Sequence, residues 1–253
     1  MSTGAPAVVT DSTASLDPAD AAREGITVVP LKVVVGARTF TEGVDISPED
    51  VAAALKEFVP VSTSRPTPEE MLAVYTRLSD EGHRSVVSVH LSAEISGTFE
   101  SAQVAAREHD DEATAVAAAL AAGECSTVLM YVDTLEYLRR GGRVGAASAL
   151  IGTALAVKPL LTIRDGVVVP LERVRTSGRA LTRLEALAVE AAVAAEDGFD
   201  IGVQHLANRE TADEVAQRLA QALGRDSVPV NEVGAVIGAH VGPGMVAVSV
   251  TPR

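Results

Sequence analysis

The sequence has very little cysteine and no tryptophan. Cys125 is the only cysteine in 253 residues, so the chain cannot form an intramolecular disulfide. Aromatic residues make up only 3% of the chain, whereas hydrophobic residues make up 47%. A chain of this length is long enough for one large or two modest domains, and its core is expected to be aliphatic and alanine-rich. Such a core suits helices packed on a sheet.

Basic charge, targeting signals and membrane spans are also scarce. The chain carries 34 acidic against 21 basic residues, a formal net charge of -13, which argues against nucleic acid or an anionic membrane as the main partner. Met1 to Asp11 lacks the basic-then-apolar plan of a signal peptide. The longest uncharged, mostly apolar run, Val144 to Val157, is shorter than the roughly 20 residues that cross a bilayer. We therefore expect a cytoplasmic protein without a membrane span.

Several catalytic motifs are absent from the sequence. It contains no G-x-S-x-G elbow, no Walker loop and no G-x-G-x-x-G loop. Its five histidines are scattered, without metal-ligand spacing among themselves or with Cys125. We therefore expect no metal and no cofactor, and a hydrolase, an NTPase or a zinc enzyme is not supported.

Short apolar strands that alternate with helix signals predict an α/β fold. Ser85 to Leu91 is a β-branched run typical of a buried parallel strand, which predicts an N-terminal, mostly parallel sheet flanked by helices over residues 1–157. Asp165-Gly166 lies between two further apolar runs and is a strong hairpin signal. It predicts a second α/β domain with a β-hairpin over residues 158–253.

Polar residues follow the first strand, Ala7 to Thr10, directly. Asp11, Ser12 and Thr13 would therefore lie at the carboxyl end of that strand. In open α/β sheets this edge is where ligands bind, although an Asp-Ser pair after a strand is about as often ordinary turn chemistry.

A cluster of hydroxyl groups and one cation precedes a predicted helix at Val61 to Glu70. Thr67 can cap this helix, with Pro68 at its first position and Glu70 closing a capping box. Pro66 favours extended geometry just before it, so we expect an exposed loop at Thr63-Ser64-Arg65. Hydroxyl donors beside a helix N-terminus form a plausible anion site. The alternative is a well-capped loop with nothing bound.

A second hydroxyl cluster lies at Ser96-Gly97-Thr98, where another loop becomes a helix. Gly97 would let the backbone approach a ligand closely. The alternative is that Ser96 simply caps the helix and needs no ligand. Two such loops favour one shared site.

Further candidate residues lie later in the chain. Arg173, Arg175 and Arg179 cluster after the hairpin, and Arg139, Arg140 and Arg143 form a cationic spot on an acidic protein, although most such spots are solvated surface. His240 lies between glycines that predict tight turns exposing its ring, although a lone loop histidine is more often incidental.

Six motifs in this order resemble the DegV family over nearly the whole chain. They are Val9 to Thr13, Thr63-Ser64-Arg65-Pro66, Ser96-Gly97-Thr98, Tyr131 to Arg143, Lys158-Pro159 and His240 to Gly244. The resemblance implies a two-domain DegV-like α/β protein that binds a long-chain fatty acid. It also implies the carrier subunit of bacterial fatty acid kinase, a part of phospholipid metabolism. Such a carrier is not itself an enzyme: it presents the acyl carboxylate to a separate, ATP-binding kinase subunit that makes acyl phosphate.

The resemblance assigns roles residue by residue. It places the fatty-acid carboxylate at Thr63, Ser64, Ser96, Gly97 and His240. It places the region of the head group or the partner at Arg175 and Arg65. The ligand and the kinase subunit are the expected partners, and a peripheral or transient membrane contact is compatible with a lipid carrier.

A rival hypothesis and one departure remain. The rival is an enzyme acting on a small phosphorylated or carboxylated metabolite at the same helix N-termini and Arg175, although no nucleophile and base pair is recognisable.

The departure is that members of the family usually carry a further strand and helix before the Tyr131 motif, where this chain has only Arg107 to Thr127. Either the element is lost or the sequence omits a stretch. We favour an omission, because deleting a buried strand would expose apolar surface and unpaired backbone groups.

Overall fold

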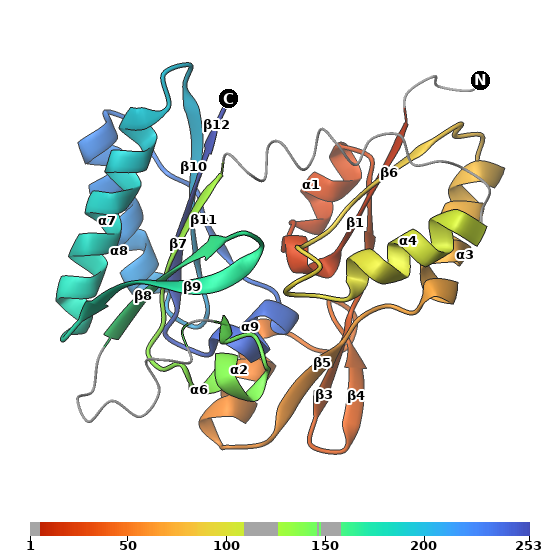
Figure 1. The fold of residues 1–253 in the computed structure, drawn as a ribbon, viewed down its shortest axis with the longest axis horizontal. Coiled ribbons are helices and arrows are strands. Elements are labelled where there is room, and N and C mark those ends of the chain that lie inside the picture. The colour runs from red at the N-terminus through yellow and green to blue at the C-terminus, as the bar shows by residue number, and fades with distance from the viewer. Residues whose placement is uncertain (1–5, 109–125, 146, 148–157) are drawn as a thin grey trace.

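The computed structural model describes residues 6–108, 126–145, 147 and 158–253. In this part of the chain three β-sheets are packed with helices, a parallel one, a small antiparallel one and a large mixed one (Figure 1). The predicted mixed α/β class, with a parallel sheet and a later hairpin, is confirmed. Cys125 and most of Val144 to Val157 lie outside the described residues.

The parallel sheet is formed near the N-terminus with strand order β2-β1-β6, and β1 pairs in parallel with both neighbours. Its strands are β1 (Ala7–Asp11), β2 (Ile26–Val29) and β6 (Val86–Val89). The helices around it are α1 (Pro18–Arg23), α3 (Pro68–Asp80) and α4 (Thr98–Glu108). Figure 1 shows α1 on one side of the sheet and α3 and α4 on the other. Buried Val9, Met71 and Ala105 join the sheet to α3 and α4 in one apolar core.

The small antiparallel sheet has the order β4-β3-β5. Its strands are β3 (Lys32–Val35), β4 (Arg38–Thr41) and β5 (Val61–Ser64). Helix α2 (Pro48–Lys56) packs near it. The prediction of a loop at Thr63 and Ser64 was wrong, because both residues pair with β3, Thr63 opposite Val33 and Ser64 opposite Lys32. Pro66 does keep the segment extended, and a neighbouring strand supplies the hydrogen bonds.

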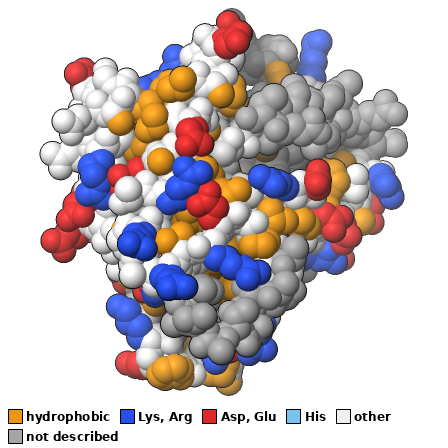
Figure 2. Space-filling model, turned by 60° about the vertical axis from the view of Figure 1, so that its left-hand side comes forward, with side chains coloured by type: hydrophobic (Ala, Val, Ile, Leu, Met, Phe, Trp, Pro, Cys, Tyr) orange, Lys and Arg blue, Asp and Glu red, His pale blue; other side chains and the backbone are white. Residues whose placement is uncertain are grey.

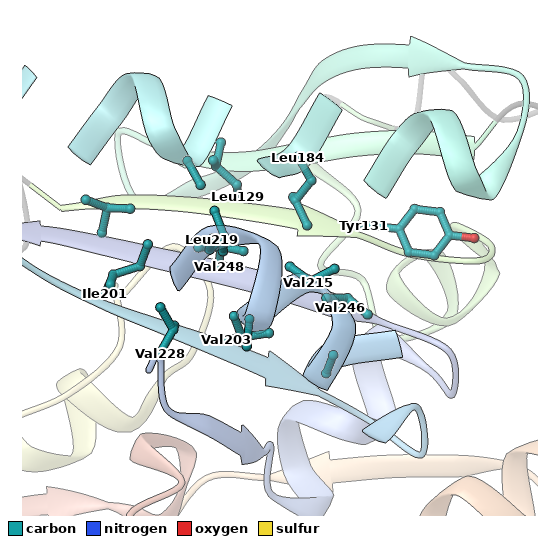
Figure 3. Packing of buried hydrophobic residues seen from close by; sticks show 14 of the residues in the cluster. Leu129, Tyr131, Leu184, Ile201, Val203, Val215, Leu219, Val228, Val246 and Val248 are labelled. Atoms are coloured by element: carbon teal, nitrogen blue, oxygen red, sulfur yellow. The ribbon is translucent and has the colours of Figure 1, made fainter. Parts of the chain in front are cut away.

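The large sheet has the order β11-β10-β12-β7-β8-β9. Its strands are β7 (Thr127–Tyr131), β8 (Lys158–Arg164), β9 (Val167–Val174), β10 (Phe199–His205), β11 (Val230–Glu232) and β12 (Val246–Pro252). Helices α7 (Ser177–Ala194) and α8 (Arg209–Leu223) lie side by side against one face (Figure 1). Figure 3 shows Leu129 and Val248 of the strands meeting Leu184 and Leu219 of these helices. The domain boundary predicted at residue 157 lies outside the described residues and stays a prediction, although β7, on its N-terminal side, pairs with β8 and β12.

Local sequence signals fix the ends of several elements. Ser47 and Asp50 form a capping box at α2, and Thr67 and Glu70 form the one predicted at α3. Asp165 and Gly166 have φ angles of 51° and 74°, which gives β8 and β9 the tight turn expected of this dipeptide.

Two short helices connect the sheets. Helix α6 (Glu136–Arg140) and helix α9 (Ala235–Val241) are in contact, and α9 also contacts α2, β3 and β5. No helix of the described residues is both long and apolar enough to span a bilayer.

Candidate functional site

The site centres on a contact between Thr63 and His240. Thr63 Oγ1 lies 2.9 Å from Nε2 of His240, a hydrogen bond between β5 and the last turn of α9. Thr63 is half-buried, whereas its strand neighbours Ser62 and Ser64 are exposed, because successive side chains of a strand point to opposite faces. Of the two adjacent hydroxyl residues predicted for the site, the structure therefore brings Thr63 to His240 and turns Ser64 outward.

His240 is held as a neutral imidazole. Burial and, to a lesser degree, the Arg143 guanidinium lower its pKa to about 4. Its Nδ1 is buried and has no hydrogen-bond partner among the described residues. Gly141 lies against the ring, since a Cβ at Gly141 would be 2.0 Å from this nitrogen. A neutral ring can donate one hydrogen bond and accept another, which suits it to hold a carboxylate or a hydroxyl group.

The predicted exposed loop around His240 was wrong. Residues 235–241 are helical, and Gly238 lies inside the helix because Leu206 packs against it: a Cβ at Gly238 would be 3.1 Å from the side chain of Leu206. Gly242, with φ 77°, ends the helix. Gly238 thus allows close packing of the helix, and Gly242 terminates it.

Ser96 caps helix α4, as the alternative interpretation proposed. Its Oγ accepts a hydrogen bond from the Thr98 amide at 3.3 Å and lies 2.9 Å from Thr98 Oγ1. Thr98 is fully buried, whereas Ser96 is half-buried. No hydrogen bond joins Ser96 to Thr63 in the described structure. A role of Ser96 in ligand binding therefore stays a prediction.

Two arginines connect the loop of Ser96 to the Thr63 and His240 segments. Arg65 donates from Nη1 to Gly97 O at 2.9 Å and pairs with Glu100 at 2.7 Å. A Cβ at Gly97 would lie 2.2 Å from that nitrogen, so the absence of a side chain at Gly97 admits the guanidinium. The close approach predicted at Gly97 is thus made by Arg65 of the same chain.

Arg143 makes the second connection. It donates from Nε to Ile95 O at 3.0 Å and from Nη1 to Gly141 O at 2.6 Å. Gly141 also contacts the His240 ring. Arg143 therefore links Ile95, the residue before Ser96, to the glycine that packs against His240. The sequence marked Arg143 as part of a cationic spot and as the last residue of the motif from Tyr131, without a role in the site. Its position directly after Gly141-Gly142, at the end of a short helix, was the available signal.

Among the described residues, no hydrogen bond or ion pair joins Arg175 to this cluster. It is exposed between β9 and α7, and it forms no hydrogen bond or ion pair with a described residue. Lys158, opposite Val174 in the hairpin, instead pairs with Asp133 at 2.8 Å. Arg175 therefore remains free to meet a partner, and its predicted role stays a prediction.

Asp11 and His90 form a buried pair that the sequence did not reveal. Asp11 Oδ2 lies 2.6 Å from Nδ1 of His90, and His90 Nε2 lies 2.8 Å from Ser88 Oγ. The side chains of Asp11 and His90 are almost completely buried. Because Asp11 ends β1 and His90 follows β6, the pair fixes the base of the loop that carries Ser96. The turn interpretation is also partly confirmed, since Asp11 accepts from the Thr13 amide at 2.9 Å.

A cavity of about 340 Å³ lies on the same strand and helix as the central contact. It is lined by Leu55, Val59, Pro60, Val61, Tyr137, Arg140 and Ala239. Small-molecule pockets range from roughly 300 to 1,000 Å³, so this one is near the lower limit. Across the described part of the chain, no three His, Cys, Asp or Glu side chains come together in a way that could hold a metal ion.

Known proteins resemble this chain over nearly its full length. A sequence model described as "Uncharacterised protein, DegV family" matches residues 6–123 and 113–253. A DegV domain-containing protein of Streptomyces coelicolor is 46% identical, with 98% of each chain covered. A DegV domain-containing protein of Halalkalibacterium halodurans is 33% identical, with 96% of this chain and 97% of the relative covered.

Solved structures share the fold. A DegV family protein from Thermus thermophilus, described by its fatty acid binding, has a TM-score of 0.87 at 29% identity and covers 97% of this chain and 99% of its own. DegV of Bacillus subtilis, described as a fatty acid binding protein, has a TM-score of 0.86 at 27% identity, with coverages of 99% and 100%. The two-domain DegV-like fold expected from the motifs is thereby confirmed.

The relatives also have more residues than this chain. The alignment with the Streptomyces protein runs over 285 positions, whereas 98% of 253 residues is about 248, so about 37 aligned positions have no residue here. The two family matches meet within residues 113–123, inside the interval from Arg107 to Thr127 that is shorter than expected. Most of this interval lies outside the described residues, and both explanations for the departure remain open.

Proposed function

The chain belongs to the DegV family, as its motifs predicted, and we propose that it binds one long-chain fatty acid and presents the carboxylate to a separate kinase subunit. Fatty acid binding is the described property of the Thermus thermophilus and Bacillus subtilis proteins. It is also that of a DegV family protein from Streptococcus agalactiae, with a TM-score of 0.88 at 26% identity and coverages of 99% and 100%. For this chain, the hydrogen bond between Thr63 and His240 is the single observation that carries the proposal.

Thr63 and His240 have the chemistry that a buried carboxylate needs. A carboxylate that leaves water must receive hydrogen bonds in exchange, and hydroxyl and imidazole N–H groups supply them. The pKa of His240, lowered to about 4, keeps the ring neutral at pH 7, so binding does not require proton uptake by this group. Ser96 would contribute a further hydroxyl by turning away from Thr98, with Ser64 and Gly97 nearby.

Burial of the acyl chain would supply most of the affinity. Each methylene group removed from water contributes about 0.8 kcal/mol, so a long chain offers roughly 10 kcal/mol before the costs of association. The polar groups would then fix the position of the carboxylate more than the strength of binding. This division of roles fits a carrier, which must hold a tail while its head group stays reachable.

The partner would approach a surface that carries basic side chains. Figure 2 shows Lys and Arg side chains over the middle and lower part of one face, among hydrophobic and some acidic ones. Arg175 is exposed and free of ion pairs with described residues, which suits it to neutralise negative charge shared between a carboxylate and ATP. Arg65 already pairs with Glu100 and would act by holding the Ser96 loop. We place the phosphorylation of the bound fatty acid by the kinase subunit in the cytoplasm.

Organic extraction of the purified protein, followed by mass spectrometry, tests the proposal. We expect about one long-chain fatty acid per monomer, a higher melting temperature after fatty acid is added to stripped protein, and no ATP hydrolysis by the isolated chain. Absence of fatty acid, with no thermal shift for any chain length, would overturn it. A small phosphorylated or carboxylated metabolite in the extract would favour the rival enzyme instead.

A further inference from the structure

Helix α9, which carries His240, is anchored at its other end by residues from the beginning of the chain. The Val236 amide donates to Glu42 Oε1 at 2.7 Å, in a fully buried contact between residues 194 positions apart. The Gly234 amide donates to Ser15 Oγ at 2.9 Å. The free N–H groups of this helix start therefore find their acceptors on the segments after β1 and β4.

The apolar side of α9 is fixed by the same part of the molecule. Ala235, Val236 and Ala239 share a buried core with Val33 of the small sheet and Leu55 of α2. The hydrogen bonds at the helix start add fixed points along the helix axis to this packing.

Glu42 occupies its position at a cost. It is only 7% exposed, and its Oε2 has no hydrogen-bond partner among the described residues. Burial raises the pKa of its carboxyl group, and the charge of Asp11 adds to this, while the hydrogen bond from the Val236 amide opposes it. An unsatisfied buried oxygen is destabilising, so an apolar residue would suit a merely structural position better.

From these contacts we infer that Glu42 is a positioning residue for His240, acting through the start of α9 to set the distance between the imidazole and Thr63. The helix has seven residues and is therefore about 10 Å long. A change of its direction at Val236 moves the ring at its far end, which lies 2.9 Å from Thr63 and in contact with Gly141. The contribution of Glu42 to fatty-acid binding rests on the proposed function, whereas its effect on the His240 ring does not.

The structure offers two independent ways to disturb the anchor. Glu42→Ala removes the acceptor, whereas Glu42→Gln keeps an oxygen for the Val236 amide. Gly234→Ala acts from the other side, because a Cβ at Gly234 would lie 2.4 Å from Glu42 Oε1 although φ at this glycine, -62°, suits alanine. In the double variant Glu42→Ala/Gly234→Ala the two changes no longer collide, so its effect is expected to be smaller than the sum of the single effects.

NMR spectra of the His240 imidazole in the ligand-free protein, assigned with His240→Gln, provide the first readout, and fatty-acid affinity provides the second. We expect Glu42→Ala and Gly234→Ala to shift the His240 signals and to weaken fatty-acid binding at least about tenfold. In Glu42→Gln, the His240 signals and the fatty-acid affinity should stay close to those of the wild-type protein. Glu57→Ala, at an exposed acid after α2, is the matched control and is expected to change neither.

Unchanged His240 signals in a folded Glu42→Ala or Gly234→Ala variant would overturn the inference, and Gly234→Ala serves if Glu42→Ala fails to fold. His240 signals in Glu42→Gln that are shifted as far as those in Glu42→Ala would likewise overturn it. If the signals move in a protein that binds no fatty acid, the positioning role stands and only the proposed function fails.

Discussion

The Thr63 hydroxyl lies 2.9 Å from Nε2 of His240, although the two residues are 177 positions apart in the sequence. Thr63 is fixed by strand pairing with Val33, and His240 is fixed by helix α9. The distance between them therefore depends on how α9 packs on the small sheet. Four predictions about the site follow from this arrangement.

Replacing Thr63 and Ser96 together with alanine is expected to weaken fatty-acid binding by one to several orders of magnitude. Two hydrogen bonds to a charged carboxylate contribute about 1.5 to 3 kcal/mol each. Fluorescent fatty-acid displacement on the folded double variant measures the effect. Ser62→Ala is the control, because Ser62 lies next to Thr63 but is exposed on the opposite face of the strand. An unchanged affinity in the double variant would move the carboxylate to another place.

Arg175→Ala is expected to separate binding from presentation. Because Arg175 touches none of the residues at the Thr63 and His240 contact, fatty-acid affinity of the isolated protein should stay the same. Acyl phosphate formation with a kinase subunit should fall at least about tenfold, or 1.4 kcal/mol. Arg173→Ala, at an exposed arginine two residues earlier, is the control. Turnover at the wild-type rate in Arg175→Ala would exclude this role.

His240 is expected to make the protein less stable in mild acid. Its pKa of about 4 in the folded protein lies below the ordinary value of 6.5, so the unfolded chain takes up the proton first as the pH falls. Stability is therefore lost from about pH 6.5 down to about pH 4, by up to roughly 3 kcal/mol at 1.36 kcal/mol per pKa unit. Urea unfolding at pH 7 and pH 4.5 measures this loss, and His240→Gln should lose less between the two values. An equal loss in the two proteins would contradict the assignment.

Gly141→Ala is expected to destabilise the protein by about 1 to 3 kcal/mol, because a Cβ there would lie 2.0 Å from His240 Nδ1 and force the ring to move. Fatty-acid binding should weaken in parallel. The matched control is Gly178→Ala in the first turn of α7, where an added Cβ meets nothing within 4 Å. That change should raise the free energy of unfolding by roughly 0.4 to 1 kcal/mol. Equal stability of the two variants in urea would show that the ring has room to move.

Short-range signals in the sequence determined much of the fold. The capping box of Thr67 with Glu70 predicted the start of α3, and Asp165-Gly166 predicted the hairpin. These succeed because both partners of each interaction lie within a few residues, so the local geometry follows from residue type alone. The motifs also carried the resemblance to the family, because each is a short run of residues that can be read directly from the sequence.

Contacts between distant segments could not be predicted in the same way. Nothing near Thr63 in the sequence indicates that its segment pairs with β3, and nothing near His240 indicates that Leu206 and Glu42 contact a helix there. The glycines around His240 suggested a loop because glycine permits turns, and the sequence does not show that Gly238 admits a neighbouring side chain. The same holds for Asp11 and His90, which are separated by 79 positions and pair only because β1 and β6 are neighbours.

The sequence by itself thus determined the class of fold and most helix and strand positions, because these depend on periodicity and local capping, and its ordered motifs carried the resemblance to the family. Only the tertiary structure decided which candidate residues meet. It brought His240 to Thr63, turned Ser64 outward, used Ser96 as a cap and left Arg175 apart from the cluster. The physical reason is that a side chain's partner across the molecule is set by strand order and helix packing, and these are properties of the whole chain rather than of any one segment.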